Sequence, residues 1–135
     1  MIALDTNVLV RHLYHGDTPE QSRIASRMVA DALAHGETAF VGAVVLAEMT
    51  LVLRHLYGLS KPALIEVLEA LWSDPAFTLE HGALVRAALD LFKRGPADFN
   101  DYLIGEIAAH AGASATYTFD RKLRRARGFR WRRSR

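Results

Sequence analysis

The chain has 135 residues, half of them apolar, and carries a formal net charge of +2. It contains no Cys, which excludes disulfides, thiolate catalysis and cysteine-ligated zinc. It also lacks an apolar run long enough to cross a membrane and the pattern of a secretion signal. We therefore expect one compact domain over residues 1–135, in the cytoplasm and without a membrane partner.

The first third of the chain predicts two strands and two helices. Residues 2–5 are typical of a short buried strand, and Thr6 or Asn7 can cap a helix that runs to about residue 14. An amphipathic helix is expected over 19–34 and a second strand over 38–42. The start signal of the second helix is Asp17, Thr18 and Pro19. Its inward face is expected to hold Ile24, Met28, Val29, Ala32 and Leu33.

The rest of the chain continues the alternation of helices and strands. Residues 44–57 form a segment that is apolar nearly all round, which favours a central helix. Ser60 can cap the next helix, with Leu64, Leu68 and Leu71 inward. The elements expected after it are a strand over 77–79, helices over 81–94 and 98–111, a strand over 115–119, a short basic helix over 121–127 and a strand over 129–131. This order favours an α/β sandwich with a mainly parallel sheet.

Two of these strands are each followed by an acid. Asp5 ends the first strand and Asp120 ends the strand TYTF, in both cases just before a helix. Each acid alone is explained by helix capping. As a pair they are expected to face one crevice, because sites in parallel sheets lie beyond the carboxyl ends of the strands.

Three further acids are candidates for the same crevice. Glu48 lies in the most apolar helix, where an ionised carboxylate needs a partner. That partner is either a functional site or a structural salt bridge to Arg11 or Arg54. Asp98 and Asp101 are three residues apart and fall in one helical turn, where they also suit the helix dipole.

Four carboxylates in one pocket repel each other unless a cation binds them. Hard divalent ions such as Mg2+ or Mn2+ take carboxylate oxygens and keep waters for substrate and nucleophile. Two such ions about 4 Å apart can activate water and stabilise the leaving oxygen in phosphodiester cleavage. Thr6, Asn7 and Thr118 could orient the acids or hold a metal-bound water, and for Thr6 a capping role is the simpler reading.

Four motifs in order resemble the PIN domain, and more narrowly the VapC toxins of bacterial toxin–antitoxin pairs. They are LDTNVLVR, LAE within the apolar helix, ADFNDYLIGEIAAHAGA and TYTFDRKL. The resemblance implies a three-layer α/β/α sandwich around a parallel sheet. It also implies a ribonuclease dependent on Mg2+ or Mn2+ that arrests translation by cutting tRNA or ribosomal RNA.

The resemblance assigns roles to particular acids and suggests partners. Asp5, Glu48 and Asp120 match the family's first, second and fourth acids, and Asp101 matches the third, with Asp98 as second choice. These acids would hold one or two metals, and none is assigned as a dedicated general base. The family also implies a homodimer and a small VapB-like antitoxin that lies along the toxin and forms a higher complex with it.

The end of the chain is strongly basic. Residues 1–120 carry 8 Lys/Arg and 15 Asp/Glu for a net charge of −7, whereas residues 121–135 carry 9 Lys/Arg and no acid. Such a segment is either a solvated end or a surface that meets RNA phosphates. The residues expected to contact nucleic acid are Arg121, Lys122, Arg124, Arg125, Arg132 and Arg133. Phe129 and Trp131 could stack on bases or pack as an edge strand.

Two other functions fit parts of this pattern. An aspartyl-phosphate phosphohydrolase also uses an acid after the first strand, but it needs a second acid two residues on, where this chain has Asn7. It also needs a Lys at the end of a later strand, where this chain has Asp120. A non-catalytic module that binds RNA or protein is the other alternative, and the complete acid set argues against it.

Overall fold

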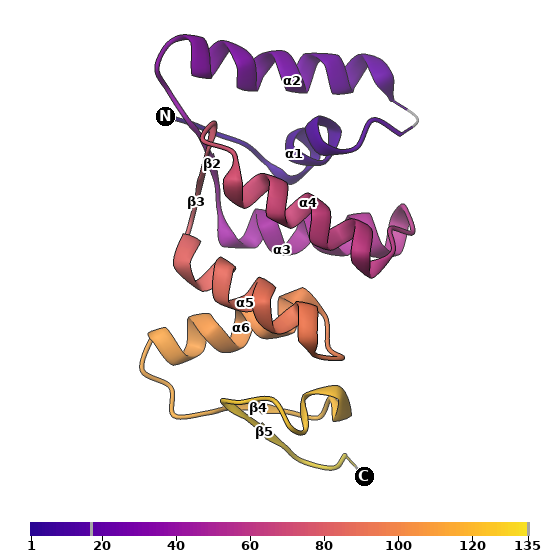
Figure 1. Cartoon of the computed structure of the whole chain (residues 1–135), viewed down its shortest axis with the longest axis vertical. Helices are drawn as coiled ribbons and strands as arrows, with labels where there is room; N and C mark the ends of the chain where they lie inside the picture. The colour runs from indigo at the N-terminus through magenta and orange to yellow at the C-terminus, as the bar shows by residue number, and fades with distance from the viewer. Residues whose placement is uncertain (17, 135) are drawn as a thin grey trace. The chain divides into compact units, whose positions relative to one another are not determined.

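A computed structural model describes residues 1–16 and 18–134, so Asp17 of the expected start signal lies outside it. The chain divides into two compact units, Met1–Gly82 and Ala83–Arg135. Strands and helices alternate along the chain, and every strand pairing is parallel (Figure 1). The predicted α/β class with parallel strands is therefore confirmed.

The first unit contains a three-stranded sheet in the order β1–β2–β3. Its strands are β1 (Ile2–Ala3), β2 (Ala39–Val41) and β3 (Phe77–Leu79). Ile2 is in register with Ala39, and Ala39 with Phe77. Because the strands are parallel, the residues that follow them emerge at one edge of the sheet, and this edge is where the first acid lies. The first strand is shorter than predicted and is not buried, since Ala3 is exposed.

Two helices, α1 (Thr6–Leu13) and α2 (Pro19–Ala34), pack together in the first unit. The bounds of α2 agree with the prediction, but its predicted inward face is partly wrong. Its buried residues are Ser22, Ala25, Val29 and Ala32. Ile24, Met28 and Leu33 are 51%, 45% and 50% exposed. Small side chains allow α2 to approach its neighbours closely, so the larger apolar ones are left at the flanks.

The apolar segment after β2 forms α3 (Ala43–Leu51) and then a π-helical turn, η1 (Val52–Leu56). It is not buried all round as predicted, because Val44 and Leu56 are 73% and 72% exposed. The next helix is α4 (Lys61–Ser73), where the Ser60 hydroxyl accepts a hydrogen bond from Ala63 N at 3.3 Å. Leu64, Leu68 and Leu71 of α4 are buried, as predicted.

The second unit holds the remaining elements, apart from the first residue of α5. They are α5 (Gly82–Arg94), α6 (Phe99–His110), β4 (Thr116–Thr118), the 3-10 turn η2 (Arg121–Leu123) and β5 (Phe129–Trp131). The last two strands pair in parallel as a separate sheet, so the strands form two sheets rather than the single sheet that was predicted. The basic helix predicted over 121–127 is reduced to η2.

The edge-strand reading of Phe129 is supported by its packing against α6. A Cβ atom at Gly105 would lie 2.6 Å from Cε2 of the Phe129 ring, so the ring packs directly on this glycine. Within the described residues, no helix is both long and apolar enough to cross a membrane.

Candidate functional site

Asp5 lies just after β1, at the carboxyl edge of the first sheet, and its side chain is exposed. Its Oδ1 accepts a hydrogen bond from Val8 N at 3.0 Å, so Asp5 itself is the N-cap of α1. The expectation that Thr6 or Asn7 caps this helix is wrong, because the strand ends two residues earlier than predicted. The Asp5 carboxylate is thus held in place by the start of its own helix.

Glu48 of α3 contacts α1 through Thr6, whose hydroxyl donates to Glu48 Oε1 at 3.1 Å. This bond brings together an acid and a supporting residue that are distant in sequence. Glu48 is exposed, which corrects the expectation of a buried carboxylate. The structural alternative also fails: the guanidinium of Arg11 donates to Gln21 and Tyr57, and Arg54 Nη1 is buried without a hydrogen-bond partner among the described residues.

Glu80 is an acid at the same sheet edge that the sequence analysis missed. It directly follows β3, and its Oε1 accepts a hydrogen bond from Ala43 N at 2.7 Å at the start of α3. The signal that could have found it is the one used for Asp5, an acid placed just after a short strand. Glu80 therefore anchors the helix that carries Glu48.

Asp98 and Asp101 form a capping box at the start of α6 in the second unit. Asp98 N donates to Asp101 Oδ2 at 3.1 Å. Burial of the Asp101 side chain raises its pKa above the ordinary value, and the negative charges of Asp120 and Asp98 raise it further. The hydrogen bond from Asp98 N and the positive charge of Lys122 act in the opposite direction. The carboxylates of Asp98 and Asp120 are therefore close enough to Asp101 to affect its pKa within this unit.

Asp120 follows β4 in the same way that Asp5 follows β1. Its Oδ1 accepts a hydrogen bond from Lys122 N at 2.9 Å, which caps η2. The Thr118 hydroxyl accepts one from the backbone N of Asp120 at 2.9 Å, so it lies beside this acid. Asn7, the third supporting candidate, is exposed and lines a groove beside α2 together with Gln21 and Ile24.

The four candidate acids share one arrangement. In each, one carboxylate oxygen accepts a protein hydrogen bond, from Val8 N for Asp5, Thr6 Oγ1 for Glu48, Asp98 N for Asp101 and Lys122 N for Asp120. The other oxygen accepts none from the described residues. Metal-ligating carboxylates are usually held in this way, with one oxygen oriented by the protein and the other available.

The donor set fits a hard divalent ion, because it consists of carboxylate oxygens with hydroxyls beside them. Within residues 1–16 and 18–134, however, no three His, Asp or Glu side chains are gathered as a group that could hold a metal. The acids are described in two sets, Asp5 and Glu48 in the first unit and Asp98, Asp101 and Asp120 in the second.

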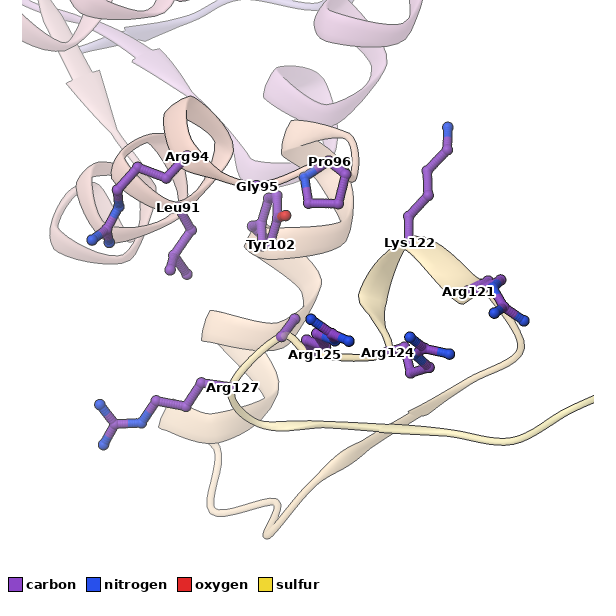
Figure 2. Close-up of a pocket in the computed structure, with 11 residues that line it drawn as sticks. Leu91, Arg94, Gly95, Pro96, Tyr102, Arg121, Lys122, Arg124, Arg125 and Arg127 are labelled. Carbon is purple, nitrogen blue, oxygen red and sulfur yellow. The ribbon is translucent and has the colours of Figure 1, made fainter.

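The basic residues near the end of the chain are exposed in the second unit. Two of them lie over aromatic rings: Arg121 Cζ is 5.7 Å from the centroid of Trp131, and Arg132 Cζ is 5.6 Å from that of Tyr117. Arg121, Lys122, Arg124 and Arg125 line a cavity together with Arg94 and Arg127, which were not predicted (Figure 2). Arg133 is exposed beyond this cavity.

The family model described as the PIN domain matches residues 2–128 and so spans both units. No curated protein matches the chain.

Proposed function

The chain belongs to the PIN domain family, and from that premise we propose that it is a metal-dependent endoribonuclease. The PIN domain is in general a metal-dependent nuclease module, so the coarse activity is hydrolysis of nucleic acid. The finer proposal is that the substrate is RNA and that the required ion is Mg2+ or Mn2+. The metal ligands proposed are Asp5, Glu48, Asp101 and Asp120, with Asp98 as the alternative third acid.

The observation that carries this proposal is the shared arrangement of the four acids. Each has one oxygen held by a hydrogen bond of 2.9–3.1 Å, which fixes its direction before any ion binds. Preorganised ligands lose little freedom on binding and keep the coordination geometry needed for catalysis. Helix capping accounts for three of these bonds but not for the bond between Thr6 and Glu48.

The residues would divide the work of the reaction among them. A bound Mg2+ or Mn2+ supplies an activated water and stabilises charge on the scissile phosphate. The carboxylates of Asp5, Glu48, Asp101 and Asp120 would hold the ion, and Thr6 and Thr118 would keep two of them in position. Asp5, Glu48 and Asp120 are exposed and therefore accessible to a polynucleotide, as an endonuclease requires.

The biological role proposed is that of a VapC-like toxin. The motif order and the family match support it. Such a protein would act in the cytoplasm, cut tRNA or ribosomal RNA and so inhibit translation. Its partners would be a second copy of the chain and a VapB-like antitoxin, whose basic side chains would suit the −7 charge of residues 1–120.

The test is cleavage of end-labelled RNA by the purified protein with Mn2+ or Mg2+. Asp5→Asn and added EDTA should each abolish cleavage, whereas Asp31→Asn, the same change at an exposed position of α2, should not. Cleavage that survives EDTA or Asp5→Asn would contradict the proposal. A folded protein that cleaves no RNA with either metal would instead support a non-catalytic binding module.

A further inference from the structure

A cavity of about 490 Å³ lies within the second unit, apart from the acids themselves. It is formed by the end of α5, the loop before α6, Tyr102 of α6 and the segment 121–127. Six cationic side chains line it: Arg94, Arg121, Lys122, Arg124, Arg125 and Arg127. We call this feature the basic pocket. No acid is among its lining residues.

The floor of the basic pocket is apolar and fixed. Tyr102 is 4% exposed, and its hydroxyl accepts a hydrogen bond from Ala97 N at 3.3 Å. Leu91 adds a second apolar surface. Because the tyrosine ring is buried, it offers no face on which a base could stack. The pocket is therefore suited to charge recognition and not to reading bases.

The cations of the basic pocket are not held in ion pairs with carboxylates of the described residues. Arg94 Nε donates to the backbone oxygen of Asp90 at 3.3 Å, and Arg121 lies over Trp131. Six like charges around one cavity repel each other and attract anions.

The layout of the cations favours a chain of phosphates over a single anion. Arg94 and Arg127 extend to one side of Tyr102, and Lys122 and Arg121 project away on the other (Figure 2). Arg124 and Arg125 lie between them. Guanidinium groups bind phosphate oxygens with two donors each, and side chains spread in this way could contact successive phosphates of one strand.

One residue of the basic pocket is hydrogen-bonded to a candidate acid. Lys122 N donates to Asp120 Oδ1 at 2.9 Å. A strand bound in the pocket would therefore lie beside Asp120 within the same unit.

From these observations we propose that the basic pocket binds the sugar–phosphate backbone of single-stranded RNA, without base preference, with Arg94 and Arg127 among its contacts. This inference rests on the proposed function, because it names where the cleaved RNA is held. The proposed RNA contacts do not include Arg132 and Arg133, because these residues do not line the basic pocket.

The test measures binding of a fluorescein-labelled single-stranded RNA of mixed sequence. Fluorescence anisotropy reports the binding, in EDTA and over a range of salt concentrations. Arg124→Gln/Arg125→Gln and Arg94→Gln/Arg127→Gln should each weaken binding about tenfold at low salt. Each pair should also reduce the slope of log affinity against log salt by about 1.4, since one phosphate contact on a single strand contributes about 0.7. Arg23→Gln/Arg27→Gln on α2 is the matched control and should change neither quantity.

Two results would overturn the inference. One is a loss of RNA affinity in Arg132→Gln/Arg133→Gln that is as large as the loss in the pocket variants. It would show that RNA is attracted diffusely to the whole basic end of the chain. The other is competition by polyglutamate as strong as by unlabelled RNA at equal charge, which would indicate an acidic protein as ligand. Circular dichroism shows whether each variant is folded. Since EDTA prevents metal-dependent cleavage, binding is measured whether or not the protein is a nuclease.

Discussion

Asp5 caps a helix in the structure and binds metal in the proposed function, and substitution can separate these two roles. As the N-cap of α1 it accepts a hydrogen bond from Val8 N, and Asn caps a helix about as well as Asp. We expect Asp5→Asn to leave the free energy of unfolding nearly unchanged, and Asp5→Ala to lower it by about 1 kcal/mol. Both should reduce metal-dependent cleavage by about a hundredfold or more, because even the partners of metal ligands contribute about 10- to 100-fold.

Urea unfolding and cleavage rates, measured on the same preparations, check this prediction. Equal stability of the two variants would show that the cap contributes little. An active Asp5→Asn protein would remove Asp5 from the reaction.

Asp101 should make stability depend on pH. Its pKa in the folded protein is raised above the ordinary value of 3.8, chiefly by burial. The folded state therefore holds this proton more tightly than the unfolded state, and the free energy of unfolding falls as the pH rises from about 3.8 through the folded pKa. Asp101→Asn cannot ionise, yet its amide oxygen can still accept the hydrogen bond from Asp98 N.

In EDTA, we expect the melting temperature of Asp101→Asn to increase relative to that of the unmodified protein as the pH rises from 4 to 7. Asp31→Asn, at an exposed position, should show no such trend. A constant difference between Asp101→Asn and the unmodified protein across this range would contradict the raised pKa.

Sequence reasoning at the residue scale succeeded where a local pattern determines geometry. An acid directly after a strand and before a helix marked Asp5 and Asp120, and the structure shows both as caps. It failed for Glu48, because an apolar sequence does not reveal which side of a helix faces solvent. It missed Glu80, whose bond to Ala43 N depends on the pairing of β2 with β3.

At the scale of elements, the packing of α6 against β5 depends on Gly105. A Cβ atom there would lie 2.6 Å from Cε2 and 2.7 Å from Cζ of Phe129. Gly105→Ala should lower the free energy of unfolding by about 1–3 kcal/mol, the usual cost of overpacking.

Urea unfolding measures this effect, with Gly82→Ala at the start of α5 as the control. A Cβ atom at Gly82 has nothing within 4 Å, so that variant should not be destabilised. Equal stability of Gly105→Ala and the unmodified protein would mean that β5 shifts freely on α6.

The periodicity of the sequence predicted most helices well, including α2, α4 and α5. It did not determine which face of α2 is buried, because several faces of that helix carry apolar residues and the neighbouring helix selects the small ones. It also could not predict the π-helical turn η1 at the end of α3. A single turn is too short to show a hydrophobic periodicity different from that of an α-helix.

For the whole molecule, the order of strands and helices was sufficient for the α/β class and the parallel pairings. Strands of two or three residues were too short to predict which strands pair with each other. In the structure β1, β2 and β3 form one sheet, and β4 and β5 form another. The expectation of one domain over residues 1–135 stays a prediction.

Metal binding is the prediction that belongs to the whole molecule. Calorimetric titration with Mn2+ should show binding, and an excess of about 100 times Kd should raise the free energy of unfolding by about 2.7 kcal/mol. Asp5→Asn and Asp120→Asn, one in each unit, should each weaken this binding, and Asp31→Asn should not. Absence of binding by the unmodified protein would refute the metal site.

The capping roles of Asp5, Asp101 and Asp120 have an evolutionary consequence. Where a carboxylate both secures a helix and serves chemistry, exchange for its amide removes only the second role. A single nucleotide change converts Asp to Asn, so a descendant that still folds but lacks the proposed activity is one mutation away. A lineage under pressure to silence such a gene product would reach this outcome without having to lose the protein.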